Sequence, residues 1–402
     1  MIVPISSLFI AIGFLAVGYG MILTFVGVYL KDIGISNTVI GIINAAFFLG
    51  AVISSILSQK IISTVGHIRS FAAFASLMVV SFLLHSLFLN EFLWAFLRFI
   101  SGFAFYGLLI ILESWLNEKS TERDRGKILA IYTIVFYLAT AIGQLFLNID
   151  EHFRQFIFTI GSILVLFSVF TIALTKIKEP QLKPFEKYNM PKIFSVVPLA
   201  TVSSFIGGFF VGGFFTMLPV YILIQNHSIE VVSYFMLITL IGGLVSQWPI
   251  GLLSDKYGRR RLIAFTSLFT SGVSLAFIFL SFNTTFLYFL GFLLGLTIFS
   301  LYPLAVARAN DVVDENKDIV EISRTLLFMY SIGSFSSPLL IGFGLSLSTY
   351  FLFGSFALLG AFLYFYSLSK ERIADDHLST FVNMPVASGA EFPELDPRQK
   401  ES

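Results

Sequence analysis

The sequence predicts an all-α membrane protein in which 12 transmembrane helices form two six-helix bundles. Three observations predict this fold: 56% of the 402 residues are hydrophobic, only 12% are charged, and long apolar segments recur along the chain. A soluble domain carries about one-quarter charged residues. So little polar surface cannot cover a protein in water, and we therefore expect lipid to surround the chain.

The individual helices are predicted from the lengths of the apolar segments. A bilayer core of about 30 Å requires roughly 20 apolar residues in a helix. Twelve segments of this kind occur, near residues 7–30, 37–58, 68–89, 92–114, 127–148, 154–175, 194–224, 230–253, 262–282, 284–306, 324–345 and 348–369.

Polar segments divide these helices into domains. The prediction comprises an N-terminal six-helix bundle at 1–175, a cytoplasmic linker at 176–193, a C-terminal six-helix bundle at 194–369 and a disordered cytoplasmic tail at 370–402. The linker and the tail each contain three prolines among polar residues, a composition that disfavours a packed core.

Two short matches indicate that the halves repeat one another. The segment LSQK at 57–60 resembles LSDK at 253–256, and YTI at 132–134 resembles YSI at 330–332. The offsets are 196 and 198 residues, close to half of the chain. Parallel repeats of this kind occur in secondary transporters.

The distribution of basic residues predicts the orientation. With the N-terminus in the cytoplasm, 22 of the 25 Lys and Arg residues fall in cytoplasmic loops and the tail. Lys31 and Arg154 then lie outside, and Arg98 lies within a span. Because cytoplasmic loops are enriched in Lys and Arg, we expect both termini in the cytoplasm of a bacterial cell and the helices in its inner membrane.

Composition also argues against several other classes of protein. The chain has no cysteine, and its five histidines do not cluster, so we expect no metal site, no cofactor and no enzyme activity. The net charge is only +1, so the chain lacks the strong positive charge that is typical of nucleic-acid-binding proteins. No phosphate-binding G-x-x-x-x-G-K-[ST] motif occurs, so we expect no ATPase within the chain.

Two motifs resemble those of the major facilitator superfamily. Residues 251–260 read GLLSDKYGRR, which is similar to the loop signature between helices two and three and between helices eight and nine of that family. The first-half copy, around Gly66 and Arg69, has Ser63 where the signature has Asp. Residues 98–102, RFISG, resemble the family's R-x-x-x-G motif in span four.

Shorter segments resemble the YcaD-like branch of this superfamily. They are Glu113-Ser114 followed by Arg125-Gly126, QWPIG at 247–251 and LYP at 301–303. The resemblance implies the major facilitator fold and a transporter role, and it names no solute. The glycine–proline pattern that marks many drug/proton antiporters is missing from residues 137–144, which argues against drug export.

Glu113 is a carboxylate within an apolar span, where an ionisable group is costly and indicates a function. One interpretation is a proton-coupling site. The other is a cytoplasmic gate residue paired with Arg69 or a nearby loop cation. Arg98 is the other candidate on span four. It either binds an anionic group of the solute or shapes proton coupling, or it braces neighbouring helices through backbone carbonyls.

The loop motif predicts a cytoplasmic latch. We expect Asp255 with Arg259 and Arg260 to pair across helices and to stabilise the outward-facing state. The glycines and the remaining basic residue of the two motif copies are Gly251, Gly258, Gly66 and Arg69.

Polar residues within the spans are candidates for the substrate pathway, because a buried hydroxyl or amide needs a partner. They are Tyr19, Asn44, Tyr106, Tyr132, Gln144, Gln247, Tyr302 and Tyr330. Together these features predict a monomeric secondary transporter that moves a small organic solute by alternating access, with protons as the coupling ion. A facilitative uniporter and a non-transporting membrane sensor or scaffold are the alternative hypotheses.

Overall fold

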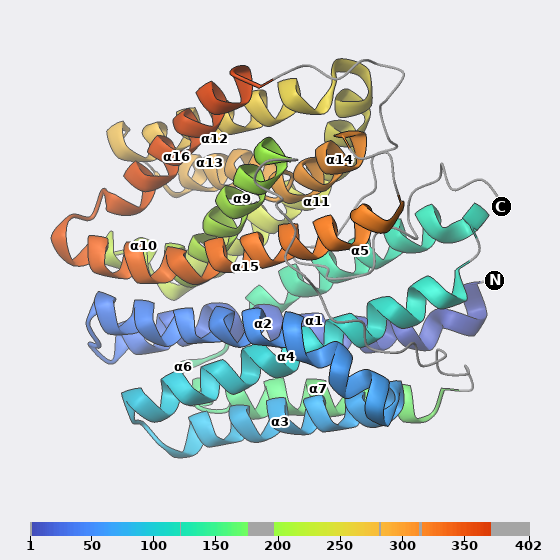
Figure 1. The fold of residues 1–402 in the computed structure, drawn as a ribbon. Coiled ribbons are helices and arrows are strands. Elements are labelled where there is room, and N and C mark those ends of the chain that lie inside the picture. The colour runs from blue at the N-terminus through green and yellow to red at the C-terminus, as the bar shows by residue number, and fades with distance from the viewer. Residues whose placement is uncertain (1, 121, 176–196, 281–282, 313–315, 371–402) are drawn as a thin grey trace.

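A computed structural model of the chain describes residues 2–120, 122–175, 197–280, 283–312 and 316–370 (Figure 1). All the regular structure in these segments is helical. Eleven helical segments are long and apolar enough to cross a membrane, and one further apolar helix spans 17 residues. The predicted linker at 176–193, and the predicted tail after Lys370, lie outside the described residues.

The helices fall into a first group and a second group along the chain. The first group comprises α1 (Ile2–Asp32), α2 (Asn37–Val65), α3 (His67–Leu87), α4 (Glu91–Lys119), α5 (Glu122–Leu145), the 3₁₀ turn η1 (Phe146–Asn148), α6 (Glu151–Arg154) and α7 (Ile157–Ala173). The second group comprises α9 (Pro198–Thr216), α10 (Leu218–Ile224), α11 (Ile229–Tyr257), α12 (Arg259–Phe279), α13 (Thr284–Ile298), α14 (Leu301–Val312), α15 (Asn316–Leu347) and α16 (Phe351–Leu368).

Two of the predicted spans are broken into two helices each. Met217 separates α9 from α10, and Phe299 and Ser300 separate α13 from α14. A proline follows each break, Pro219 and Pro303 respectively. Proline lacks a backbone N–H and its fixed φ suits the first turn of a new helix, which explains why the helices restart there.

Most helix packing occurs within each group. In the first group α2 packs on α4, and α1 packs on α5 and α7; in the second, α9 packs on α15 and α12 packs on α16. The groups meet where α2 lies along α15 and where α5 lies along α11 (Figure 1). The other interfaces between the groups are smaller, so these two pairs form most of the boundary.

The two groups repeat the same helices. Both α2 and α11 contain 29 residues and both α3 and α12 contain 21; α11 starts 192 residues after α2, and α12 starts 192 residues after α3. Gly66 and Gly258 connect these pairs with φ of 91° and 85°, a conformation that favours glycine. The LSQK and LSDK segments, 196 residues apart, are therefore not structural counterparts; the match is displaced by about one helical turn.

The connections of the chain define two ends of the helices. We call the end that contains Gly66 and Gly258 the motif end, and the end that contains Gly34 and the α15–α16 connection the distal end.

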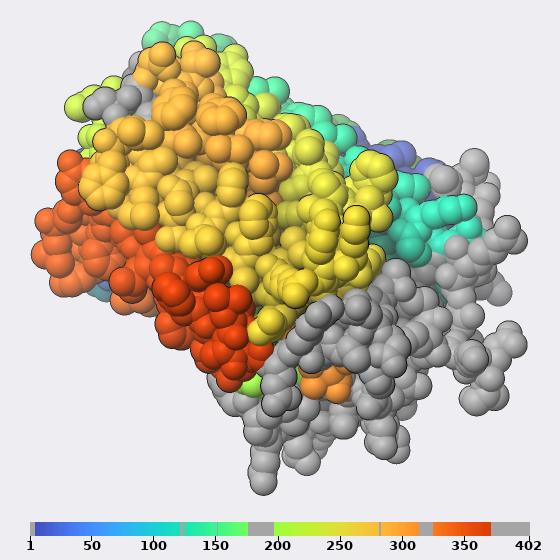
Figure 2. Space-filling view, turned by 90° about the horizontal axis from the view of Figure 1, so that it is seen from above, coloured from blue at the N-terminus to red at the C-terminus, as the bar shows by residue number. Residues whose placement is uncertain are grey.

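The outer surface of the helices is apolar. Figure 2 shows one face formed by the second group, with α11, α12, α13 and α16 on view. Trp248, Phe279 and Phe362 are among the large side chains that these helices expose. Such a surface suits a lipid environment, where helices satisfy their backbone groups internally and present apolar side chains outward.

Candidate substrate pathway

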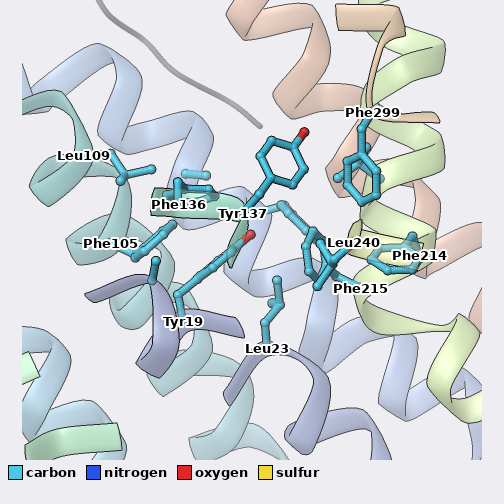
Figure 3. Close-up of a cluster of buried hydrophobic side chains, with 14 of the residues drawn as sticks. Tyr19, Leu23, Phe105, Leu109, Phe136, Tyr137, Phe214, Phe215, Leu240 and Phe299 are labelled. Carbon is cyan, nitrogen blue, oxygen red and sulfur yellow. The ribbon is translucent and has the colours of Figure 1, made fainter. Parts of the chain in front are cut away.

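Aromatic rings from both groups meet between the two ends of the helices (Figure 3). Tyr19 of α1 stacks on Phe105 of α4 with ring centroids 4.0 Å apart, and its ring lies 5.8 Å from that of Phe215 in α9. Tyr137 of α5 contacts Phe299, at the α13–α14 break, with centroids 5.5 Å apart. We call these five residues the aromatic centre, which therefore combines rings from both groups of helices.

Further tyrosines are buried in the same core as the aromatic centre. The rings of Tyr302 in α14 and Tyr330 in α15 lie 4.9 Å apart, and that of Tyr106 in α4 lies 6.3 Å from Phe47. The hydroxyls of Tyr137 and Tyr330 are buried and have no hydrogen-bond partner among the described residues. An unpaired buried hydroxyl costs about 1–3 kcal/mol, so both are suited to bind a polar group of a solute or a water molecule.

Glu113 lies nearer the motif end of α4 and is 2% exposed. The hydroxyl of Tyr132 in α5 donates a hydrogen bond of 2.7 Å to its Oε1. The adjacent residue, Ser114, contacts a ring nitrogen of His67 at 3.2 Å, while Arg69 is exposed on α3. Glu113, the predicted proton-coupling or gate residue, and Tyr132, a predicted pathway residue, are thus direct partners.

Arg98 lies toward the distal end of α4 and is 1% exposed. Its Nη2 donates to Oδ1 of Asn44 at 3.3 Å, and its guanidinium lies over the ring of Phe47, 4.6 Å from the centroid. Both partners belong to α2. Within the described segments the side chain bonds to this amide and to no backbone carbonyl, so the predicted carbonyl brace is not observed there.

The motif residues form a charged network at the motif end. Arg259 is buried and pairs with Asp255 at 2.5 Å and with Asp311 of α14 at 3.6 Å, and it also contacts Ser254. Arg260 donates to the carbonyls of Leu368 and Lys370 at 3.1 and 2.7 Å. These contacts connect α11, α12, α14 and the end of α16, all within the second group.

The motif glycines lie within a helix or at the turns between helices. Gly251 is buried in α11, and Gly66 and Gly258 form the two positive-φ turns.

Two predicted glutamines connect helices. Gln144 of α5 donates from its side-chain Nε2 to the backbone carbonyl of Gly20 in α1 at 2.8 Å. The backbone carbonyl of Gln144 accepts a hydrogen bond of 2.7 Å from the hydroxyl of Ser233 in α11. Gln247 of α11 donates to the carbonyl of Phe299 at 3.5 Å, which ties it to the α13–α14 break. Gln144 therefore lies on the boundary between the groups, and Gln247 lies beside the aromatic centre.

The groups also contact each other at the distal end. Asn37 of α2 donates to the carbonyl of Leu345 in α15 at 3.3 Å, and the hydroxyls of Thr38 and Ser346 lie 3.1 Å apart. Gly41 packs directly against the carbonyl of Pro338, where an added Cβ would collide with it. The α2–α15 interface is therefore closed at this end of the molecule.

Several residues of the centre were absent from the sequence-based candidates. Tyr137, Phe105 and Phe215 are examples, and all three contact rings of other helices. With 48 phenylalanines in the chain, the sequence gives no signal that separates a central ring from a lipid-facing one. Tyr137 had a usable signal, since it carries a hydroxyl within an apolar span.

Taken together, the many membrane-crossing segments and the polar–aromatic layer between two groups of helices define a multi-pass membrane protein. Residues 8–320 match the family model described as Major Facilitator Superfamily, and the chain belongs to that superfamily.

Curated relatives carry the same family description. The uncharacterized MFS-type transporter YcaD of Escherichia fergusonii is 26% identical over 298 residues, which cover 74% of this chain and 77% of the relative. An uncharacterized MFS-type transporter of Enterobacter sp. strain 638 is 28% identical with the same coverage of both chains.

Solved transporter structures share the fold. The nucleoside transporter NupG superposes with a TM-score of 0.75 at 13% identity, covering 90% of this chain and 98% of its own. A bacterial homolog of the human lysosomal transporter Spinster, in an inward-facing and unoccupied conformation, superposes with a TM-score of 0.70 at 13% identity, covering 90% of this chain and 96% of its own.

Proposed function

We propose that the protein is a secondary active transporter that moves a small organic solute across the bacterial inner membrane by alternating access. The observation that carries this proposal is the aromatic centre, because rings from both groups of helices form it. In the proposed architecture, 12 spans make two six-helix bundles, 1–175 and 194–369, and the shorter helix α7 is the twelfth span. A monomer suffices for this mechanism.

The proposed closed end of the pathway is the distal end. The contacts of Asn37, Thr38 and Gly41 with α15 support closure at the distal end. The basic residues of the motif end, including Arg259 and Arg260, support a cytoplasmic location for that end and for both termini. The linker at 176–193 and the tail at 370–402 then lie in the cytoplasm.

Protons are the proposed coupling ion, and Glu113 is the proposed carrier. Its burial in α4 and its hydrogen bond from Tyr132 support this role, because a carboxylate in a low-dielectric site can exchange a proton as its surroundings change. The competing role is a gate residue whose charge stabilises the closed motif end. The motif network of Asp255 and Arg259 is proposed to stabilise one of the two transport states.

Reconstitution into liposomes tests the proposal. A panel of metabolites and amphipathic compounds is first screened for thermal stabilisation of the purified protein, and the stabilising compounds are then tested for flux with a pH dye inside the vesicles. Solute movement with proton movement is expected. Solute movement without protons indicates a uniporter, and stabilisation without any flux indicates a sensor.

A further inference from the structure

Building on the proposed transport function, we propose that the solute is an organic anion whose carboxylate binds Arg98 and Asn44 while its apolar body lies against the aromatic centre. The inference names a substrate class for the pathway.

The first argument is charge. Arg98 is 1% exposed, and among the described residues its side chain has one hydrogen bond, to the neutral Asn44, and no carboxylate partner. A guanidinium removed from water without a counter-ion is costly, and within a membrane such a group pairs with an anion or contacts water. The face of Phe47 offsets part of this cost and leaves the positive charge in place.

The second argument is unused hydrogen-bond donors. Nε of Arg98 and Nδ2 of Asn44 are both buried, and neither has a partner in the described part of the chain. The two side chains already contact each other through Nη2 and Oδ1 at 3.3 Å. A guanidinium and an amide held together in this way offer donors to both oxygens of a carboxylate, for which arginine has the matching planar geometry.

The third argument is the position of this pair. Phe47, which lies under the guanidinium, has its ring 6.1 Å from that of Tyr19 and 6.3 Å from that of Tyr106. The cation is therefore one ring away from the aromatic centre. A solute with a carboxylate at one end and a compact apolar or aromatic body fits both parts of this arrangement.

Matched acids and amides test the proposal. Benzoate and benzamide, phenylacetate and phenylacetamide, and octanoate and octanamide are titrated against the purified full-length protein, with sodium chloride at equal ionic strength. The measurement is the melting temperature. At least one acid is expected to raise it by several degrees with a half-saturating concentration at least tenfold below that of its amide. No difference in any of the three pairs, or the same rise with chloride, overturns the proposal.

Variants then locate the binding group. Arg98→Gln is expected to weaken the acid at least tenfold and to leave the amide unchanged, whereas Arg261→Gln, an exposed arginine on α12, leaves both unchanged. Should Arg98→Gln fail to fold, Asn44→Ala keeps the cation and is expected to weaken the acid severalfold. Acid binding that survives in every variant that folds overturns the assignment.

Flux measurements separate this inference from the transport proposal. Acid-selective binding without flux in liposomes supports the anion site and contradicts the transport proposal. Flux of neutral or cationic solutes by a protein that lacks acid selectivity has the opposite meaning: the protein is a transporter, and the anion site is wrong.

Discussion

At the scale of single residues, Glu113 and Arg98 are buried in α4, and each is hydrogen-bonded to a polar side chain of a neighbouring helix. Glu113 and Arg98 stand out because charges are rare in apolar segments. Their partners, Tyr132 and Asn44, are also among the sequence candidates, yet they lie 19 and 54 positions away along the chain. Only helix packing brings such positions together, and a single sequence does not record it.

The Glu113 carboxylate gives the first prediction. Glu113→Gln is expected to abolish uphill, pH-driven solute accumulation and to leave solute exchange across the vesicle membrane within about twofold of wild type. The reason is that the amide retains the contact with Tyr132 but cannot release a proton. Both quantities are measured with the same labelled solute in proteoliposomes.

Glu118→Gln is the matched control, since Glu118 lies near the end of α4, is partly exposed and pairs with Lys119 at 3.6 Å. It is expected to behave as wild type. Full accumulation by Glu113→Gln would assign proton coupling to another group and leave Glu113 as a gate residue.

At the scale of helices, close crossings are repeated in the two groups. An added Cβ on Gly102 of α4 would collide with the carbonyl of Phe47 in α2, as one on Gly295 of α13 would with the carbonyl of Thr239 in α11. The helix pairs α2–α4 and α11–α13 therefore cross closely at these glycines. Small residues allow such contacts between membrane helices, where packing replaces the hydrophobic driving force.

This crossing gives the second prediction. Gly102→Ala is expected to destabilise the protein by about 1–3 kcal/mol, because the α2–α4 backbones have to separate. Gly272→Ala on α12 is the control: Gly272 is exposed and an added Cβ meets no atom within 4 Å. Melting temperatures in one detergent provide the comparison, and equal values for the two variants would contradict the crossing.

Helix boundaries were largely predictable, and the helix breaks were not. Apolar length predicts each span because the bilayer imposes it. The breaks at Met217 and Ser300 follow from Pro219 and Pro303. Both prolines lie within continuous apolar segments, so apolar length alone predicts one unbroken helix in each place. The LSQK and LSDK match is displaced by four residues from the 192-residue spacing of the turns at Gly66 and Gly258, because short similar segments recur by chance.

At the scale of the whole molecule, the two groups are joined mainly by α2 with α15 and α5 with α11. The largest helix interfaces otherwise lie within each group, which is the arrangement that alternating access requires of two bundles. Alternating access then requires that opening at the distal end accompanies closure at the motif end.

Spin-label distances give the third prediction. Labels at Thr38 and Ser346 report the distal end, and labels at Lys127 of α5 and Lys256 of α11 report the motif end. The chain has no native cysteine, so introduced cysteines are the sole labelling sites. A stabilising solute is expected to lengthen one distance while it shortens the other, because the state it prefers becomes more populated. Distances that change in the same sense would contradict rigid-body rocking.

The most direct test of transport through this pathway is solute flux by the Thr38→Cys/Ser346→Cys variant in proteoliposomes. Its two thiols replace hydroxyls that lie 3.1 Å apart across the α2–α15 interface. The account predicts that oxidation to the disulfide stops flux and that reduction restores it, because the distal end has to open in every cycle. Flux that continues at the same rate with the disulfide formed would contradict alternating access between the two groups.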